Sequence, residues 1–216
     1  MNTRIANALF GYFEALYDLN RNVIMLCGFD LEDLSRPYEK LMGNIIVAIP
    51  QLVPYVFDKA TERYIISPKD GLLEYSAEIP YLQTGYEEIL KKHYIFLSAI
   101  KKIRNKFEHK MHGATLKSSG KVSGRSLAGI PYSSFDMTYS VEGEEIELQS
   151  RDIINFAFDM NNLFSKLQKS VEQYAEDSEK IEYPYYQRLL RFNFADFNWI
   201  YKSDVLHLVG KTLFPF

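Results

Sequence analysis

Residues 104–109 read Arg-Asn-Lys-Phe-Glu-His, so that Arg104, Asn105 and His109 lie within six residues. Histidine exchanges protons near neutral pH, and arginine presents a planar, permanently charged fork that matches phosphate oxygens. RNA is cleaved without a metal ion when its own 2′-hydroxyl attacks the adjacent phosphodiester. That reaction needs a proton acceptor, a proton donor and a cation that holds the developing charge. The string contains residue types for all three tasks.

This string lies in a segment with the apolar spacing of a helix. Apolar residues recur at intervals of seven, four, three, four and four, at Ile89, Phe96, Ile100, Ile103, Phe107 and Met111. The period predicts one helix from Gln83 to about His112, with Gly113 at its end. One face of this helix is expected in the core, and the other presents cations, an amide and imidazoles.

An Arg-Asn-x3-His string on the polar side of a core helix resembles the signature of the HEPN superfamily (higher eukaryotes and prokaryotes nucleotide-binding domains). These domains are small helical bundles, and many are metal-independent endoribonucleases of toxin, abortive-infection and CRISPR-associated systems. The resemblance implies that His109 is the acid–base group and that Arg104 holds the phosphorane charge. It implies that Asn105 orients the histidine or the phosphate, and it calls for no metal and no cofactor.

The helical geometry bears on how this site is assembled. Arg104 and His109 are five residues apart and diverge by about 140° on an ideal helix, whereas Asn105, His109 and His112 fall within roughly 60° of one another. One helix therefore does not aim both Arg104 and His109 at one phosphate. In the family that the string resembles, two copies of the motif helix meet around a shared cleft. We therefore expect a homodimer with Arg104 and His109 from both chains.

Other interpretations of the string stay open. In toxins that pair with a nucleotidyltransferase antitoxin, the motif continues His-x-Tyr and that tyrosine is modified, but Met111 occupies the position here. An antitoxin or regulatory protein is an expected partner, without that modification being implied. The main alternative is a non-catalytic HEPN-like module that binds a nucleotide or a partner protein. A third interpretation is a structural helical protein in which Arg104 pairs with Glu108.

Basic residues are concentrated around the string. Residues 91–125 contain ten Lys or Arg and one acid, a net charge of +9, while the rest of the chain carries −12. A basic stretch in an acidic protein is typical of a polyanion-binding surface, and the alternative is a solvated helix face followed by a loop. The side chains expected to contact RNA are Lys101, Lys102, Lys106, Lys110, His112, Lys117, Lys121 and Arg125.

Composition predicts a folded protein of one domain, residues 1–216. The chain is 47% hydrophobic, with 16 Tyr and 15 Phe, which is enough for a full core. A single cysteine, Cys27, excludes an internal disulfide, and with four scattered histidines it disfavours a zinc site. The N-terminus has no signal pattern, and the most apolar run, 41–57, is too interrupted to span a bilayer. We expect a cytoplasmic protein with no membrane partner.

The remaining patterns predict an all-α, HEPN-type helical bundle with a small insertion at about 113–149. Helices are expected at 2–26, at 38–49 with a kink or restart up to Phe57, and at 150–175. Glycine and serine predict a loop at 113–129, and alternation predicts a β-hairpin at about 132–149. Residues 61–81 are interpreted as a connection with at most short elements. His93 and His207 are interpreted as core histidines, and the tail at 183–216 as core or dimer interface.

Overall fold

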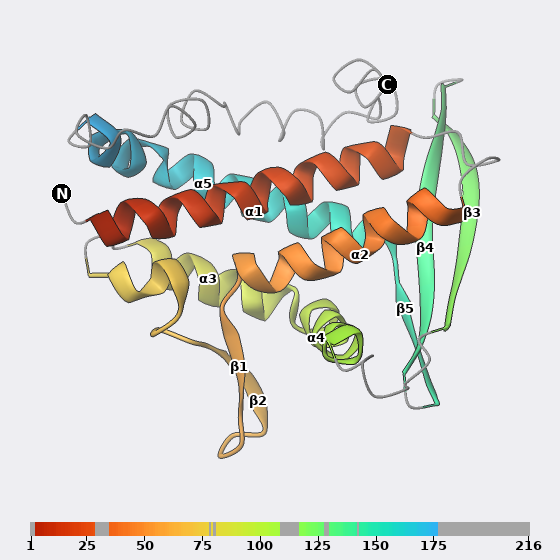
Figure 1. The fold of residues 1–216 in the computed structure, drawn as a ribbon, viewed down its shortest axis with the longest axis horizontal. Helices are drawn as coiled ribbons and strands as arrows, with labels where there is room; N and C mark the ends of the chain where they lie inside the picture. Colours follow the sequence, from red (N-terminus) through yellow and green to blue (C-terminus); the bar gives the residue numbers. More distant parts are fainter. Residues whose placement is uncertain are drawn as a thin grey trace.

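The computed structural model describes residues 3–28, 35–77, 79, 81–108, 117–127, 130–141 and 143–176. Its α-helices are α1 (Thr3–Gly28), α2 (Ser35–Leu52), α3 (Tyr81–Lys92), α4 (Tyr94–Glu108) and α5 (Ser150–Glu176). Its other elements are the strands β1 (Tyr55–Asp58), β2 (Arg63–Ile66), β3 (Lys117–Leu127), β4 (Ile130–Val141) and β5 (Glu144–Leu148), and the 3-10 helix η2 (Gly71–Tyr75). Figure 1 shows the helices in one bundle, with β3–β5 at one end and the β1–β2 hairpin projecting from it.

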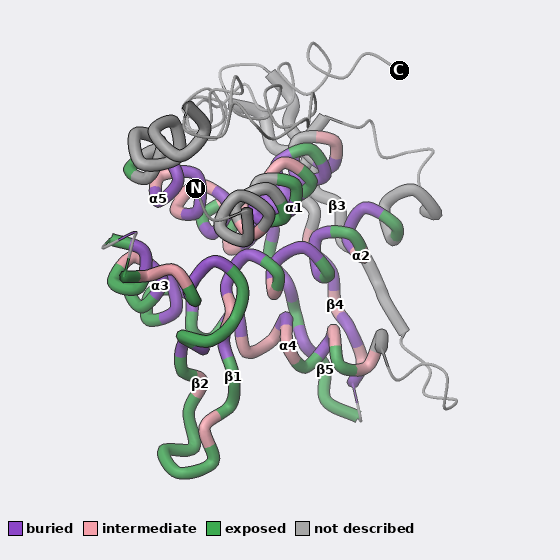
Figure 2. The backbone as a smooth tube through the Cα atoms, turned by 60° about the vertical axis from the view of Figure 1, so that its left-hand side comes forward, coloured by how far each residue is buried: buried purple, intermediate pink, exposed green. Residues whose placement is uncertain are grey.

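The long helices α1 and α5 lie side by side and turn buried stripes toward the rest of the bundle (Figures 1 and 2). Buried residues follow helical spacing on both, at Tyr12, Leu16, Leu19, Val23 and Leu26 on α1 and at Ile153, Phe156, Met160 and Leu163 on α5. Helix α2 packs on α1 and buries Met42, Ile45 and Ile49 completely. The three helices predicted at 2–26, 38–49 and 150–175 are therefore confirmed, with ends that differ by a few residues.

Two buried asparagines join α1 to α5. The Nδ2 of Asn20 donates to the Oδ1 of Asn161 at 3.0 Å, and the Nδ2 of Asn161 donates back to the Oδ1 of Asn20 at 2.8 Å. Neither side chain is exposed to solvent. Because a buried amide without its partner is costly, a sliding of one helix along the other is disfavoured. The pair therefore sets the register between α1 and α5.

Helices α3 and α4 replace the single helix predicted from Gln83 to His112. The chain turns at His93, and Figure 1 shows α3 lying across the view while α4 runs nearly along the line of sight. Ile89 on α3 and Phe96 on α4 are both buried, so the apolar spacing continues through the bend. The prediction of one helix was wrong because the spacing of apolar residues does not show where the helix axis changes direction. At the bend, His93 contacts Asp159 on α5, which is distant in sequence.

The chain is mostly helical, but it is not purely all-α, which corrects the predicted fold class. Strands β1 and β2 form an antiparallel hairpin with Phe57 opposite Tyr64, and its outer part is exposed (Figure 2). At the turn, the Asp58 carboxylate accepts hydrogen bonds from the Ala60 N–H at 3.1 Å and the Thr61 hydroxyl at 2.7 Å. Aspartate reverses a chain in this way by bonding to groups two or three residues on. The predicted continuation of the second helix to Phe57 is wrong, because β1 occupies Tyr55–Asp58. The connection predicted at 61–81, with at most short elements, contains β2 and η2, both of which are short.

The second sheet has the strand order β3-β4-β5 and is antiparallel throughout. Strands β4 and β5 confirm the predicted hairpin at 132–149, which turns at Gly143 with a φ of 85°. Strand β3 occupies residues 117–127, where a loop was predicted, and pairs with β4 from Lys117–Ser140 to Leu127–Ile130. Its Gly and Ser have low strand propensity, but a neighbouring strand that supplies hydrogen bonds overrides propensity.

The sheet is tied to the bundle at the start of α5. This helix begins at Ser150, as predicted, and carries Asp152 in its first turn. The Asp136 carboxylate of β4 accepts hydrogen bonds from the Ser150 N–H at 2.8 Å and from its hydroxyl at 3.1 Å. A carboxylate at a helix N-terminus is favoured by the unpaired N–H groups and by the helix dipole. This contact places β4 and β5 against the helices.

Candidate functional site

Helix α4 carries residues 104–108 of the predicted string at its C-terminal end. Its core side is fully buried at Leu97, Ile100 and Ile103. Its outer side exposes Lys102 and Asn105 and partly exposes Lys101, Arg104 and Lys106. The predicted division of this segment into an apolar and a polar side is confirmed for the described residues. Because one side is anchored in the core, the polar side chains project from a rigid support.

Arg104 lies at the border between the two sides of α4, beside Tyr55 of β1. The Tyr55 side chain is buried, and its hydroxyl donates a 2.7 Å hydrogen bond to the backbone carbonyl of Leu97. Burial raises the pKa of Tyr55 above its usual range, Tyr64 raises it further, and the charge of Arg104 lowers it. The Arg104 guanidinium is therefore close enough to act on the phenol. On the same ring, the Lys101 Nζ lies 5.6 Å from the centroid.

The structure covers the predicted site in part. Asn105 is exposed on the outer side of α4, as its predicted role requires. Outside the described residues lie His109, Lys110 and His112, the side chains of Phe107 and Glu108, and the side chains of Lys117, Lys121 and Arg125, whose backbone lies in β3. The structure therefore gathers Lys101, Lys102, Arg104, Asn105 and Lys106 on one helix, and the placement of His109 stays a prediction.

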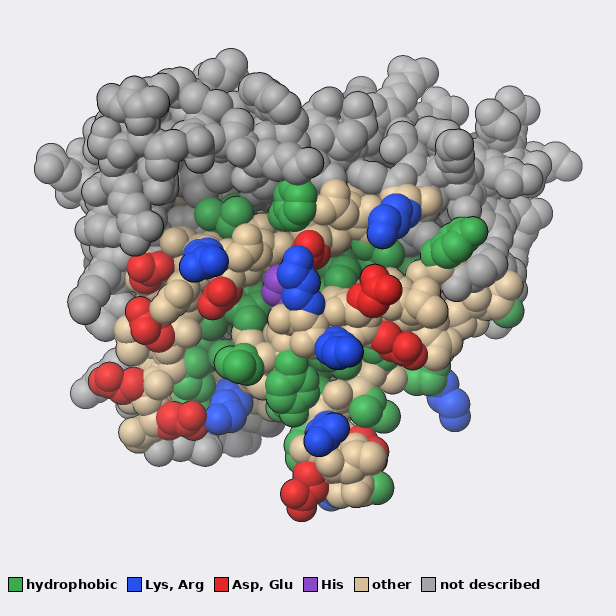
Figure 3. Space-filling model, turned by 180° about the vertical axis from the view of Figure 1, so that it is seen from behind, with side chains coloured by type: hydrophobic (Ala, Val, Ile, Leu, Met, Phe, Trp, Pro, Cys, Tyr) green, Lys and Arg blue, Asp and Glu red, His purple; other side chains and the backbone are tan. Residues whose placement is uncertain are grey.

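Acidic side chains accompany the cations of α4. The Nζ of Lys102 lies 3.0 Å from Oε2 and 3.2 Å from Oε1 of Glu144 on β5, and both side chains are largely exposed. Exposed pairs of this kind contribute little stability because water and salt screen them. Figure 3 likewise shows basic and acidic side chains interspersed over the face it presents. The net charge of +9 in the sequence therefore does not produce a uniformly basic surface over the described part of that face.

His93 is a buried, hydrogen-bonded core histidine, as predicted. Its side chain is 7% exposed, and its Nε2 lies 2.6 Å from the Oδ2 of Asp159. The Lys92 Nζ reaches the same oxygen at 2.6 Å, and the His93 ring meets Phe156 edge-on at 5.5 Å. These contacts join the bend between α3 and α4 to α5. His207 lies outside the described residues.

Sequence reasoning missed a group of aromatic side chains where the β1–β2 hairpin meets α4. The Tyr64 ring lies 5.5 Å from the rings of both Tyr55 and Phe57, and 6.1 Å from that of Tyr94. Figure 3 shows hydrophobic side chains at the base of the projecting hairpin. Two short runs of aromatic and β-branched residues, 55–57 and 64–66, could have indicated a hairpin around the turn at Asp58, but not which rings meet.

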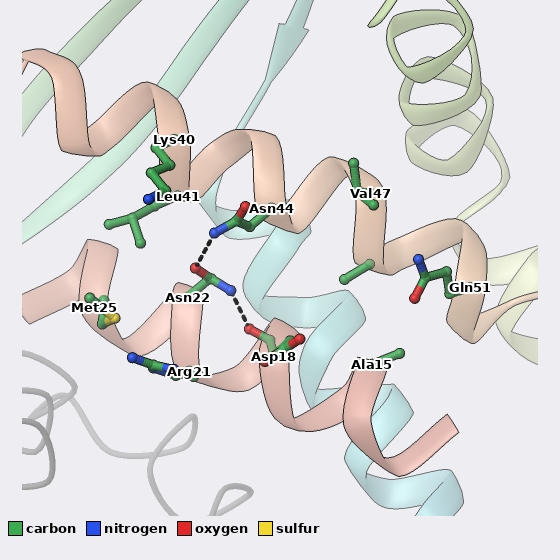
Figure 4. A pocket seen from close by; sticks show the side chains of 11 residues that line it. Ala15, Asp18, Arg21, Asn22, Met25, Lys40, Leu41, Asn44, Val47 and Gln51 are labelled. Carbon is green, nitrogen blue, oxygen red and sulfur yellow. Dashed lines mark hydrogen bonds between the residues drawn. The ribbon is translucent and has the colours of Figure 1, made fainter. Parts of the chain in front are cut away.

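A groove of about 510 Å³ lies between α1 and α2 (Figure 4). Arg21, Lys40 and Asp18 contribute charged groups to its lining. The Asn44 Nδ2 donates to the Asn22 Oδ1 at 3.2 Å, and the Asn22 Nδ2 donates to the backbone carbonyl of Asp18 at 2.6 Å. All of the lining residues belong to α1 or α2, so the groove shares no residue with the string on α4.

The described residues contain neither a metal-binding cluster nor a helix that could span a membrane. Among the described residues, no group of three or more His, Cys, Asp or Glu is placed to hold a metal ion. In the same part of the chain, every helix is too short or too polar to cross a membrane. Comparisons with protein-family models, with curated proteins and with solved structures find no match to this chain. Function is therefore inferred from the residues and their placement.

Proposed function

We propose that this protein is a HEPN-type, metal-independent endoribonuclease of the defence or toxin kind that cleaves single-stranded RNA. The observation that carries the proposal is the placement of Arg104 and Asn105 near the end of a helix whose other side is core. Arg104 lies at the border of the polar side and Asn105 is exposed on it, with Lys101 and Lys106 partly exposed nearby. Phosphate contacts and catalytic groups would thus share one rigid element.

The proposed chemistry uses the substrate's own hydroxyl as the nucleophile. His109 takes the proton of the 2′-hydroxyl as it attacks phosphorus, and a second His109 protonates the leaving 5′-oxygen. Arg104 donates two hydrogen bonds to the phosphorane oxygens, which carry the developing negative charge. Asn105 orients the histidine or the phosphate. The products are a 2′,3′-cyclic phosphate and a 5′-hydroxyl, and no step requires a metal ion.

A second copy of the chain completes the site in this proposal. Arg104 and His109 diverge by about 140° on a continuous helix, so the polar sides of two α4 helices must face one another to place both groups on one phosphate. Light scattering at micromolar concentration should then give the mass of a dimer. A strict monomer would contradict this arrangement. An antitoxin or other regulatory protein is a further proposed partner of the same side of α4.

The test of the proposal is cleavage of single-stranded RNA in the presence of EDTA. The expected result is cleavage with a 2′,3′-cyclic phosphate on the product. An RNA that carries a single 2′-deoxy residue at the cleavage position should stay intact there, because its nucleophile is missing. A requirement for divalent metal, or cleavage at the 2′-deoxy position, would show that the proposed reaction is wrong.

The groove between α1 and α2 favours a second candidate function, a non-catalytic HEPN-like module that binds a nucleotide. Arg21 and Lys40 could contact phosphate, and Asn44 could contact a base edge. Calorimetric titration with ATP and GTP, compared between the wild type and Arg21→Ala, tests this candidate. Binding that depends on Arg21 in a protein without ribonuclease activity would favour it. A module that docks a partner protein through α4 is the other form of this alternative.

A further inference from the structure

Three aromatic side chains form a continuous, partly exposed surface between the β1–β2 hairpin and the start of α4, which we call the ring surface: Phe57, Tyr64 and Tyr94. Tyr64 is in the middle, with ring contacts to Phe57 at 5.5 Å and to Tyr94 at 6.1 Å. Phe57 is 52% exposed and Tyr94 is 37% exposed. Single exposed apolar residues are ordinary, but a contiguous exposed cluster usually marks a binding surface.

Positive charge lies next to the ring surface. Burial and then Tyr94 raise the pKa of Tyr64, and the charge of Lys102 lowers it, which places the Lys102 ammonium near this phenol. The Lys101 Nζ lies 5.6 Å from the centroid of the adjoining Tyr55 ring. Both lysines project from α4, and Arg104 lies one turn further along the same helix. Ten residues separate Tyr94 from Arg104, which is about 15 Å along the axis.

We propose that the ring surface is a stacking site for bases of single-stranded RNA, with Lys101 and Lys102 contacting the phosphates between it and Arg104. This inference rests on the proposed function and adds the path of the substrate over the protein. Aromatic rings stack on every base, because each base has a π-face, and lysines follow the backbone without reading sequence. The site therefore selects single strands, whose bases are free to stack, without selecting a sequence.

The charges around the rings favour a polyanion over a protein partner. Lys102 pairs with Glu144 at 3.0 Å, and both side chains of this pair are exposed, so that a phosphate can replace the carboxylate. The hairpin tip carries two acids and two bases, whose formal charges cancel: Asp58, Lys59, Glu62 and Arg63. The net charge at the rings is thus set by α4, and it is positive.

The test measures RNA binding by variants that lose a ring and keep an apolar side chain, Phe57→Leu and Tyr94→Leu. The probe is a labelled 2′-O-methyl oligouridine of about 12 nucleotides, which cannot undergo 2′-hydroxyl attack. Each variant should bind about tenfold more weakly, equivalent to about 1.4 kcal/mol. The matched controls should bind like the wild type: Val56→Ala, whose side chain is 42% exposed on the opposite face of the same strand, and Tyr94→Phe, which keeps the ring.

A second probe separates stacking from charge. An abasic oligonucleotide of the same length keeps the phosphates and lacks the bases. It should bind the wild type and Phe57→Leu with equal affinity, because there is nothing to stack. The proposal is overturned if Phe57→Leu and Tyr94→Leu bind the oligouridine like the wild type. It is also overturned if both variants change the mass in light scattering and leave RNA binding unchanged, since the rings would then be a protein interface.

Failure of this site and failure of the proposed function give different results. Binding of the 2′-O-methyl probe involves no cleavage and does not require the proton transfer assigned to His109. Ring-dependent binding by a protein that leaves ordinary RNA intact would support the stacking site and reject the ribonuclease. Cleavage of ordinary RNA by a protein whose binding ignores both ring substitutions would do the reverse.

Discussion

The hydroxyl of Tyr55 donates a 2.7 Å hydrogen bond to the backbone carbonyl of Leu97, and so ties the β1–β2 hairpin to α4. Tyr55 is 4% exposed and Leu97 is fully buried, so this bond is shielded from water. In a low-dielectric interior such a hydrogen bond is strengthened, and its loss costs more free energy of folding. Because the Lys101 ammonium and the Arg104 charge both act on the Tyr55 ring, the bond also fixes the surroundings of these two cations.

Tyr55→Phe should lower the free energy of unfolding by about 1 kcal/mol, the usual net contribution of one hydrogen bond. The ring remains, so packing and the cation–π contact with Lys101 are kept. Urea denaturation measures the change. The control is Tyr81→Phe, whose side chain is 67% exposed and should unfold like the wild type. Equal stability of Tyr55→Phe and the wild type would show that the bond to Leu97 does not stabilise the fold.

Asp159→Ala should destabilise the protein by about 1–3 kcal/mol, because it leaves the buried His93 ring without its acceptor. The same urea experiment compares it with Lys92→Ala. The Lys92 side chain is 63% exposed, so its 2.6 Å pair with Asp159 is screened and its loss should cost less than about 1 kcal/mol. If the two variants lose equal stability, the His93–Asp159 contact does not hold the bend between α3 and α4.

Arg104→Ala and His109→Ala should each reduce the rate of RNA cleavage by on the order of 100-fold or more, as expected for loss of a charge-stabilising donor or an acid–base group. Arg104→Lys should also be slow, since an ammonium does not reproduce the guanidinium fork. Because both residues act on one transition state, the double variant should lose far less than the product of the two effects. Single-turnover rates measure all four proteins.

The control for this series is Ser98→Ala on the same helix. The Ser98 hydroxyl donates to the backbone carbonyl of Tyr94 at 2.7 Å and has no role in the proposed reaction. It should cleave RNA at the wild-type rate. Wild-type cleavage by His109→Ala would instead rule out the acid–base role of this histidine and favour the binding-module alternative.

The salt dependence of RNA binding should show whether Lys101 neutralises a phosphate. For single strands the slope of log K against log salt changes by about 0.7 for each phosphate that the protein no longer neutralises. Lys101→Gln should reduce the slope by about that amount, measured by fluorescence anisotropy over a range of salt concentrations. Lys91→Gln is the matched control, since Lys91 is exposed on α3 and outside the proposed path. Equal slopes for both variants would remove Lys101 from the RNA-binding surface.

Much of the helical core was predictable because apolar residues that recur at helical spacing form one face of a helix, and that face is buried. Leu16, Leu19 and Val23 recur at helical spacing and are fully buried on α1, and Ile153 and Phe156 are likewise buried on α5. The bend at His93 was not predictable, because the side-chain contact found there is made to a residue 66 positions away. Strand β3 was missed for a related reason: its polar, glycine-rich sequence takes strand form through pairing with β4.

In the candidate site, too, local features were predictable from the sequence and contacts between distant elements were not. The polar side of α4 followed from periodicity, and Asn105 is exposed where a phosphate-facing amide is needed. The effect of the Arg104 charge on Tyr55 and the contact of Lys102 with Glu144 depend on β1 and β5, whose positions against α4 no local pattern encodes. The rings at Phe57 and Tyr64 come together only in the hairpin register, so their grouping was visible only in three dimensions.

The amide pair between Asn20 and Asn161 also has a consequence for the order of assembly during synthesis. The two residues are 141 positions apart, so α1 emerges from the ribosome long before its partner in α5 exists. Until then the Asn20 amide stays hydrated, and the apolar stripe of α1 lacks its packing partner on α5. Contacts this distant in sequence form late and slow folding. A nascent chain that already contains Arg104 therefore cannot complete its bundle until residue 161 has been made, which delays the proposed ribonuclease activity.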